Sequence, residues 1–354
     1  MSPSRPKVLI ACDKNVRENY VDPTELQRLE KLADWEWFEC AGGGIYDTPD
    51  DPQKIDAIKE HLSDIDALVL CHGAPRIDEP LLAHAPKLKI IGELEGDRFA
   101  VRIDLDAAWA RGVRTVDTTN GSSYPVAEWA LGMILVCLRN AGAHFRRLIA
   151  GNTGRDPDVV RLMGGLLQGK RVGIIGGGHM SRRLIKLLKP FEGEIWVHDP
   201  YLPRELAEAV GFVQTSLDNV FSHCDIVVCM APLTPGTRGM IGERELGLLR
   251  SGSIFVNVSR GAVVDSAALI ARIKKNDIVA GIEAFEPEPI PADSEILALD
   301  NVFLSPHFGW LTGTDYPHFF PLMIDEFERF FAGHEPYFEL TPLAKANRLG
   351  DTPE

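Results

Sequence analysis

The amino-acid sequence predicts an α/β protein built on doubly wound parallel sheets. Short apolar runs alternate with segments of helical periodicity along nearly all of its 354 residues, and strands that alternate with helices pair in parallel. Three consecutive glycines also follow one apolar run just where a helix is expected, as in nucleotide-binding sheets. The predicted strands are Val8–Cys12, Ala67–Cys71, Lys89–Gly92, Arg171–Ile175, Glu194–His198, Ile226–Met230, Ser253–Val258, Val279–Ala284 and Val302–Ser305.

Helical patterns fill the segments between these strands. The tail after Gly333 has little periodicity, and we expect it either to wrap the surface or to be loose. The predicted helices are Asp51–Ser63, Pro125–Arg139, Ser181–Leu188, Leu202–Val210, Ser266–Lys275 and a last one from about Leu322 to Phe331.

The composition is that of a globular protein, with 45% hydrophobic and 25% charged residues. A formal net charge of −14 repels phosphate backbones, so we expect no nucleic-acid partner. The longest apolar run, Trp129–Leu138, is too short to span a bilayer, and the polar segment Met1–Pro6 is not a signal peptide. The six cysteines form no C-x-x-C pair and have no zinc spacing. We therefore expect a cytoplasmic protein with no bound metal and no membrane contact.

The glycine-rich turn lies in the sequence RVGIIGGGHMS, which runs from Arg171 to Ser181. Gly176 permits a tight turn, and Gly178 lets the backbone approach a pyrophosphate at the N-terminus of the following helix. Ser181 stands where a third glycine is usual, but serine is small enough for close packing. The motif by itself is as often only a turn.

An acid at the end of the next strand strengthens this interpretation. Asp199 lies 21 residues after Gly178, where a carboxylate would bind the adenosine ribose. The same charge would repel a 2′-phosphate, so NAD is favoured over NADP. Asp199 could otherwise be only a turn residue before Pro200.

Three polar residues follow the last three predicted strands, whose carboxyl ends share one edge of the sheet. Arg260 could bind a carboxylate in bidentate fashion, and His307 could exchange a proton near neutral pH. Glu288 could fix the imidazole of His307 in one tautomer. Each residue taken alone is better explained as structural, and it is their convergence beside a dinucleotide site that indicates catalysis.

At these residues the chain resembles the D-isomer-specific 2-hydroxyacid dehydrogenases, from about Asp66 to Phe331. The resemblance implies two Rossmann-like domains with a cleft between them, an NAD cofactor, and a homodimer formed through the helix Pro125–Arg139. The matching segments are APKLKIIG, IDLDAAWARGV, VAEWALGMIL, VGIIGGGHM, HDPY, APLTPGTRGMI, FVNVSRGAVVD, EAFEPEP and SPHFGW.

The resemblance also implies roles for individual residues. Arg260 would bind the substrate carboxylate and keto oxygen, His307 would be the acid/base, and Glu288 its partner. Residues 121–310 would form the NAD-binding domain, and residues 1–120 with 311–354 a discontinuous substrate-binding (catalytic) domain. The cofactor contacts it implies are Gly176, Gly178, His179, Met180, Asp199, Pro232, Thr237, Val258, Ser259, Arg260, Glu283, His307 and Gly309.

The chain departs from the family pattern at several positions. Glu283 stands where Asp is usual near the nicotinamide carboxamide, and Ser122 stands where Asn is usual. The loop GELEGDRFAVR, from Gly92 to Arg102, replaces a shorter glycine-rich turn. Trp310, which follows His307-Phe308-Gly309, is similar to the tryptophan of the H-x-A-W motif in the glycerate dehydrogenase/hydroxypyruvate reductase branch. It could also be only a packing residue.

The charged loop bears on the substrate. Carboxylates accept hydrogen bonds from hydroxyl groups, so a small 2-hydroxy acid or 2-keto acid with further hydroxyls is favoured if these side chains face the cleft. The loop charges could equally pair with one another in solvent. The predicted substrate contacts are His72, Gly73, Glu95, Arg98, Arg260 and His307.

Two alternatives remain at this point. Formate dehydrogenases of the family carry Gln where Glu288 stands, which argues against that activity. A non-catalytic NAD-sensing scaffold, like the family's transcriptional corepressors, would keep the same three polar residues. Only turnover with 2-keto acids separates it from an enzyme.

Overall fold

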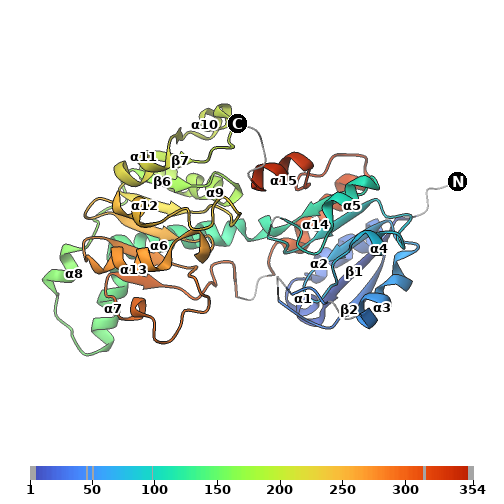
Figure 1. Ribbon diagram of the computed structural model, residues 1–354, viewed down its shortest axis with the longest axis horizontal. Coiled ribbons are helices and arrows are strands. Elements are labelled where there is room, and N and C mark those ends of the chain that lie inside the picture. The colour runs from blue at the N-terminus through green and yellow to red at the C-terminus, as the bar shows by residue number, and fades with distance from the viewer. Residues whose placement is uncertain (1–4, 45–46, 50–51, 98, 314–315, 350–354) are drawn as a thin grey trace. The chain divides into compact units, whose positions relative to one another are not determined.

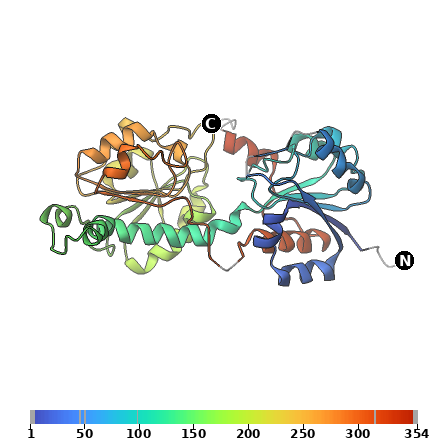
Figure 2. The same ribbon diagram turned by 90° about the horizontal axis from the view of Figure 1, so that it is seen from below.

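The computed structural model describes residues 5–44, 47–49, 52–97, 99–313 and 316–349 (Figure 1). The chain divides into two compact units. The first comprises Met1–Ser122 and Thr312–Asn347, and the second comprises Ser123–Leu311. Each unit is a parallel sheet flanked by helices (Figure 2), so the predicted α/β class with two doubly wound sheets is confirmed.

The first unit is built on a five-stranded parallel sheet. Its strands are β1 (Lys7–Asp13), β2 (Asp34–Cys40), β3 (Ala67–Leu70), β4 (Ile90–Glu93) and β5 (Arg114–Asp117). Their order is β2-β1-β3-β4-β5, so the chain reverses direction across the sheet between β1 and β3. Ligands of open parallel sheets bind beside such a point, at the carboxyl ends of the strands.

Helices cover both faces of this sheet (Figure 2). They are α1 (Lys14–Asn19), α2 (Pro23–Leu32), α3 (Pro52–Leu62), α4 (Glu79–Leu82), α5 (Leu105–Ala110), α14 (Phe319–Phe331) and α15 (Pro342–Leu349), with a 3-10 turn η1 (Thr119–Ser122). Alternate strand residues such as Leu9 and Leu68 pack under α3, α4 and α5. Helices α2 and α14 pack against each other on the opposite face.

The second unit is built on a seven-stranded parallel sheet in the order β12-β11-β10-β9-β6-β7-β8. Here the chain reverses between β6 and β9, so the loops after these two strands flank the expected ligand site. The strands are β6 (Val172–Ile175), β7 (Ile195–His198), β8 (Val213–Gln214), β9 (Ile226–Cys229), β10 (Ile254–Asn257), β11 (Val279–Ile282) and β12 (Val302–Leu304).

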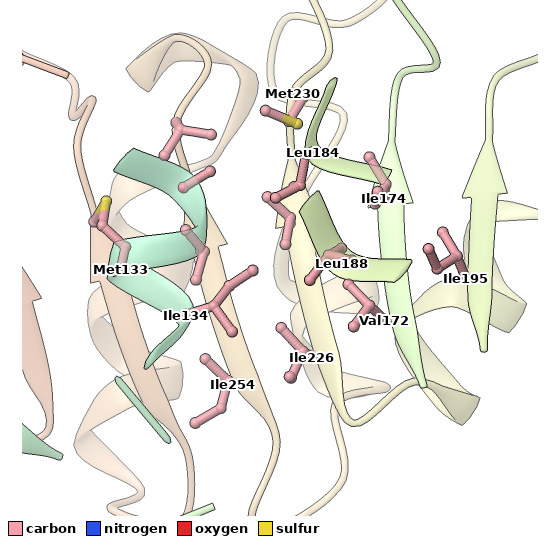
Figure 3. Packing of buried hydrophobic residues seen from close by; sticks show 14 of the residues in the cluster. Met133, Ile134, Val172, Ile174, Leu184, Leu188, Ile195, Ile226, Met230 and Ile254 are labelled. Atoms are coloured by element: carbon pink, nitrogen blue, oxygen red, sulfur yellow. The ribbon is translucent and has the colours of Figure 1, made fainter. Parts of the chain in front are cut away.

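Helices also cover both faces of the larger sheet. They are α6 (Ser123–Leu138), α7 (Ala141–Ile149), α8 (Pro157–Arg161), α9 (His179–Leu188), α10 (Arg204–Val210), α11 (Leu217–His223), α12 (Glu243–Gly247) and α13 (Ser266–Lys274), with 3-10 turns η2 (Lys189–Phe191), η3 (Gly261–Val263) and η4 (Glu295–Ala298). Figure 3 shows Ile134 of α6 and Leu184 of α9 packing over Ile174 and Ile226 of the sheet. Residues of α11, α12 and α13 bury the opposite face.

The apolar character of α6 has a structural cause. By length and composition alone the helical stretch Thr119–Leu138 could cross a membrane, contrary to the expectation from the shorter apolar run. However, 44% of its most apolar window is buried in the structure, with Met133 and Cys137 packed on the sheet. Core helices of globular proteins commonly pass such a test.

The nine predicted strands all occur, and the sequence pattern fails to predict only short or edge strands. Strand β2 reads DWEWFEC, so its acidic residues hide the apolar pattern at an edge where they meet solvent. Strands β5 and β8 are only four and two residues long.

The described part of the tail, from His334 to Leu349, is not loose. Asp117 N–H donates to the Phe338 carbonyl (3.2 Å) and Leu340 N–H to the Thr115 carbonyl (2.8 Å), so the tail lies along the β5 edge. The tail then forms α15, which the weak periodicity does not predict.

Candidate active site

The glycine turn after β6 has the shape required for a close approach to a ligand. Gly176 has φ +88°, and a Cβ on it would lie 2.8 Å from the Ala231 Cα. Gly178 is the N-cap of α9 and offers no side-chain cap to the first-turn N–H groups, so the helix end suits an anion. Buried Ser181, at the third-glycine position, donates its hydroxyl proton to the Gly176 carbonyl (2.5 Å).

Asp199 follows β7 and faces the glycine turn. Its carboxylate accepts hydrogen bonds from Gly177 N–H (2.8 Å) and Tyr201 N–H (2.9 Å). The acid is therefore both a turn residue and a neighbour of the predicted pyrophosphate site. Each oxygen accepts one of these bonds and keeps a lone pair for another donor, such as a ribose hydroxyl.

Arginines beside the turn carry positive charge that sequence reasoning overlooked. Arg182 Nε donates to the Gly178 carbonyl (3.4 Å), and burial together with the neighbouring Arg183 guanidinium lowers the Arg182 pKa. Among the described residues no carboxylate pairs with either guanidinium. Uncompensated cations at a helix N-terminus are unfavourable until an anion is present, which fits a pyrophosphate.

The remaining predicted cofactor contacts lie on the same edge of the sheet. Thr237 donates to the Pro232 carbonyl (2.6 Å) in the turn after β9. Ser259, next to Val258, donates to Asn257 Oδ1 (2.8 Å) in the turn after β10. His179 and Met180 occupy the first turn of α9.

A histidine and a glutamate form the candidate proton-transfer pair. His307 Nδ1 lies 2.7 Å from Glu288 Oε1, and the two side chains are 30% and 41% exposed. His307 follows β12, and its backbone has φ +54°, in the left-handed region that residues with a Cβ rarely adopt. Because Nδ1 is engaged by the carboxylate, Nε2 is the nitrogen that can exchange a proton with a ligand.

Arg260 is half-buried in the turn after β10, where Nη1 donates to the Ser259 carbonyl (2.9 Å). Buried Asn257 holds this turn, since its amide donates to the carbonyls of Arg260 (3.3 Å) and Ala284 (3.0 Å). Strands β10, β11 and β12 are neighbours, so Arg260 and His307 leave the same edge of the sheet. The sequence alone could not identify Asn257 as a residue that holds this turn. One of its two partners follows β10 and the other follows β11, so the contacts form only in the folded sheet.

Glu283, which follows β11, is only 5% exposed. Its two oxygens accept hydrogen bonds from Trp129 Nε1–H (2.7 Å) and Gly309 N–H (2.6 Å). The Glu283 side chain, which is longer than the usual aspartate, therefore places its carboxylate between these two donors within the second unit. Each of its oxygens still has a lone pair that could accept from the nicotinamide carboxamide.

In the first unit, the predicted substrate residues His72 and Glu95 lie together at the carboxyl edge of the sheet. Glu95 Oε2 accepts a hydrogen bond from the Tyr20 hydroxyl (2.8 Å) and lies 3.2 Å from His72 Nε2. Burial, then the Glu95 charge, raises the pKa of Tyr20, so the hydroxyl stays protonated. Gly73 has φ +80° and no room for a Cβ against Gly42. Arg98 lies outside the described residues.

Two other charges of the predicted loop face inward. Arg102 Nη1 donates to Glu93 Oε1 (2.7 Å), and neither side chain has exposed surface. Of the two interpretations of the loop charges, substrate contact or mutual pairing, these two residues follow the second. They pair with each other in the core, however, and not in solvent.

Across the described ranges, no cluster of three or more His, Cys, Asp or Glu side chains is placed to hold a metal ion. The six cysteines are buried free thiols.

Comparison with known proteins identifies the family. Residues 131–309 match the profile of the D-isomer specific 2-hydroxyacid dehydrogenase NAD binding domain. D-3-phosphoglycerate dehydrogenase of Methanocaldococcus jannaschii is 34% identical over 71% of this chain and 47% of that protein. Glyoxylate reductase of Thermococcus litoralis is 34% identical over 72% of this chain and 76% of that enzyme.

A phosphoglycerate oxidoreductase from Rhizobium etli has the same fold, with a TM-score of 0.79 and 22% identity over 96% of this chain and 100% of that chain. The chain spans about half the length of the phosphoglycerate dehydrogenases that it matches. The resemblance found in the sequence is confirmed: the chain belongs to the D-isomer-specific 2-hydroxyacid dehydrogenase family and carries that family's NAD-binding domain.

Proposed function

We propose that the protein is an NAD-dependent dehydrogenase that interconverts a small 2-hydroxy acid and its 2-keto acid. The observation that carries this proposal is the 2.7 Å contact between His307 Nδ1 and Glu288 Oε1. The carboxylate holds the imidazole in one tautomer, which leaves Nε2 to face a ligand. An imidazole held in this way is suited to proton exchange at a substrate oxygen.

The proposed chemistry divides between three side chains. Arg260 binds the substrate carboxylate and polarises the C2 oxygen. His307 Nε2 takes the proton of the C2 hydroxyl during oxidation and returns it during reduction. NAD, when bound, accepts or supplies the hydride of C2. Glu288 stabilises the imidazolium that forms on His307 during oxidation.

The residues around the glycine turn fit NAD. The uncapped first turn of α9 and the Arg182 guanidinium suit a pyrophosphate. Asp199 suits a ribose diol and disfavours a 2′-phosphate, so we propose a preference for NADH over NADPH.

Glu95 of the first unit is proposed to select the substrate. Glu95, which accepts the Tyr20 hydroxyl proton, presents a carboxylate acceptor at the carboxyl edge beside the β1/β3 reversal. Such an acceptor favours a keto acid with further hydroxyls, such as hydroxypyruvate or a longer polyhydroxy acid.

A homodimer is also proposed. Three apolar side chains of α7 are exposed in the single chain: Phe145 by 64%, Leu148 by 56% and Ile149 by 69%. Apolar patches of this kind are usually covered by a partner, and α7 directly follows the helix α6 through which the resemblance implies dimers.

The six free thiols fit a reducing compartment, so we propose a cytoplasmic location.

The test is turnover of NADH with a panel of 2-keto acids. Oxidation of NADH with at least one hydroxylated or simple 2-keto acid is expected. Tight NADH binding without turnover of any panel member would refute the proposal and favour the NAD-sensing scaffold.

A further inference from the structure

The loop that carries His307 is tied to β11 at both ends. Ser305 N–H donates to the Ile282 carbonyl (2.9 Å), and Gly309 N–H donates to Glu283 Oε1 (2.6 Å). The two acceptors belong to consecutive residues at the end of β11. The backbone of His307 lies between these ties.

Trp129 of α6 completes this arrangement. Its Nε1–H donates to Glu283 Oε2 (2.7 Å), and its ring packs against Phe308 at 5.1 Å between centroids. A Cβ on Gly309 would lie 2.7 Å from Trp129 Cδ1. The loop therefore rests directly on the indole, with no space between them.

We propose that Trp129 and Glu283 are positioning residues that hold His307 in its proton-transfer geometry. This inference rests on the proposed function of His307. Left-handed backbone at a residue with a Cβ persists only where the surroundings hold it. The buried Glu283 carboxylate supplies that restraint, because it joins the loop to α6 and β11 at once.

The stem length of Glu283 is essential to this role. Its two donors come from different elements, a helix and a loop. Aspartate keeps the charge but is shorter by one methylene, so its carboxylate cannot keep both bonds without moving the loop. We therefore expect E283D to be harmful although Asp is the usual family residue.

Two substitutions test the arrangement. W129F removes only the indole N–H and keeps an aromatic ring against Phe308, while E283D shortens the carboxylate stem. Each is expected to lower kcat about 10- to 100-fold, the scale of a small misplacement of a reacting group. The apparent pKa in the pH profile of kcat should also shift, because the His307–Glu288 contact changes. The NADH affinity of W129F, measured by fluorescence titration, should stay unchanged, because Trp129 is not one of the predicted cofactor contacts.

Matched controls separate positioning from general damage. W109F removes an indole hydrogen bond of the same kind, from Trp109 to Thr115 (2.9 Å) in the first unit. E245D shortens another buried glutamate, which accepts from Gly242 N–H (3.0 Å). Both controls should keep wild-type kcat and the wild-type pH profile.

The decisive measurement repeats W129F and E283D in an H307A background. If they act through His307, neither should lower the residual rate further. An equal further loss in that background, an increase in the NADH dissociation constant of W129F, or unchanged kcat in both single variants would overturn the inference. H307A turning over at the wild-type rate would instead refute the proposed function.

Discussion

Glu93 and Arg102 form an ion pair at the end of β4 with no exposed surface on either side chain. The Arg102 backbone N–H also donates to Glu93 Oε2 (2.8 Å), and its Nη2 donates to the carbonyls of Gly44 (2.7 Å) and Asp47 (3.1 Å). Through these hydrogen bonds, Arg102 connects the loop after β2 to the loop after β4. Its role is to shape the carboxyl edge of the first unit.

Removing one partner of this pair should destabilise the protein strongly. R102M leaves the Glu93 carboxylate buried without its cation, which costs about 3–5 kcal/mol. Urea unfolding should show the loss, and the double variant E93L/R102M should recover part of it. R111M is the control, because the Arg111–Glu79 pair is exposed and ion pairs in solvent contribute little to stability. Equal effects of R102M and R111M would contradict this account.

The position of each group explains how far the sequence could predict the site. The glycine turn and Asp199 lie at a fixed spacing within one βαβ unit, so the pattern is local. Glu288 and His307 could be paired because parallel strands share an edge. Tyr20 and Trp129 could not be predicted, since Tyr20 meets Glu95 and Trp129 meets Glu283 only through tertiary packing.

The same reasoning applies to the fold. Buried strands such as Ile226–Cys229 are wholly apolar and stand out in the sequence. The edge strand Asp34–Cys40 does not, because its side chains alternate between core and solvent among acidic residues. The sequence leaves Glu93 and Arg102 either facing the cleft or paired in solvent, and it does not reveal their burial, since that burial depends on the pairing itself.

Replacing His307 by Ala should remove the proton relay. The rate should fall by about 10²–10⁴-fold, while NADH affinity should hardly change because the proposed site of the adenosine end is the glycine turn. Steady-state kinetics with the best keto acid and fluorescence titration of NADH check the two parts. Near-normal turnover of this variant with several 2-keto acids would rule out the assignment.

Cofactor choice should depend on the charge of Asp199. The wild-type enzyme should prefer NADH. D199N should lower the ratio of kcat/KM for NADH to kcat/KM for NADPH by about 10-fold, because it removes the repulsion of a 2′-phosphate. Asparagine keeps one oxygen to accept from Gly177 N–H, so the turn is preserved better than in D199A. The ratio of kcat/KM for the two cofactors measures this. Equal efficiency of both cofactors in the wild type would show that Asp199 does not meet the ribose.

The exposed face of α7 should be covered by a second copy of the chain. Light scattering at micromolar concentration should give the mass of a dimer, and L148D should shift the protein toward monomer by burying an unpaired charge. L297D, at another exposed leucine of the second unit, should leave the dimer intact. A monomeric wild type would disprove the proposed assembly.

Substrate ranking should follow the polar groups of the first unit. Hydroxypyruvate or a longer polyhydroxy keto acid should exceed pyruvate and 2-ketoisocaproate in kcat/KM, because a site with a buried acceptor rejects analogues without the matching hydroxyl. Glu95 is the proposed acceptor, since its carboxylate accepts a hydrogen bond from Tyr20 at the sheet edge and lies 3.2 Å from His72 Nε2. E95A should therefore reduce the preference by roughly 10- to 100-fold, the scale of a hydrogen bond to a charged group. Y20F should reduce it less, and E60A, at an exposed glutamate of α3, should not change it. A better kcat/KM for 2-ketoisocaproate, or an unchanged ranking in both E95A and R98A, would exclude this substrate class.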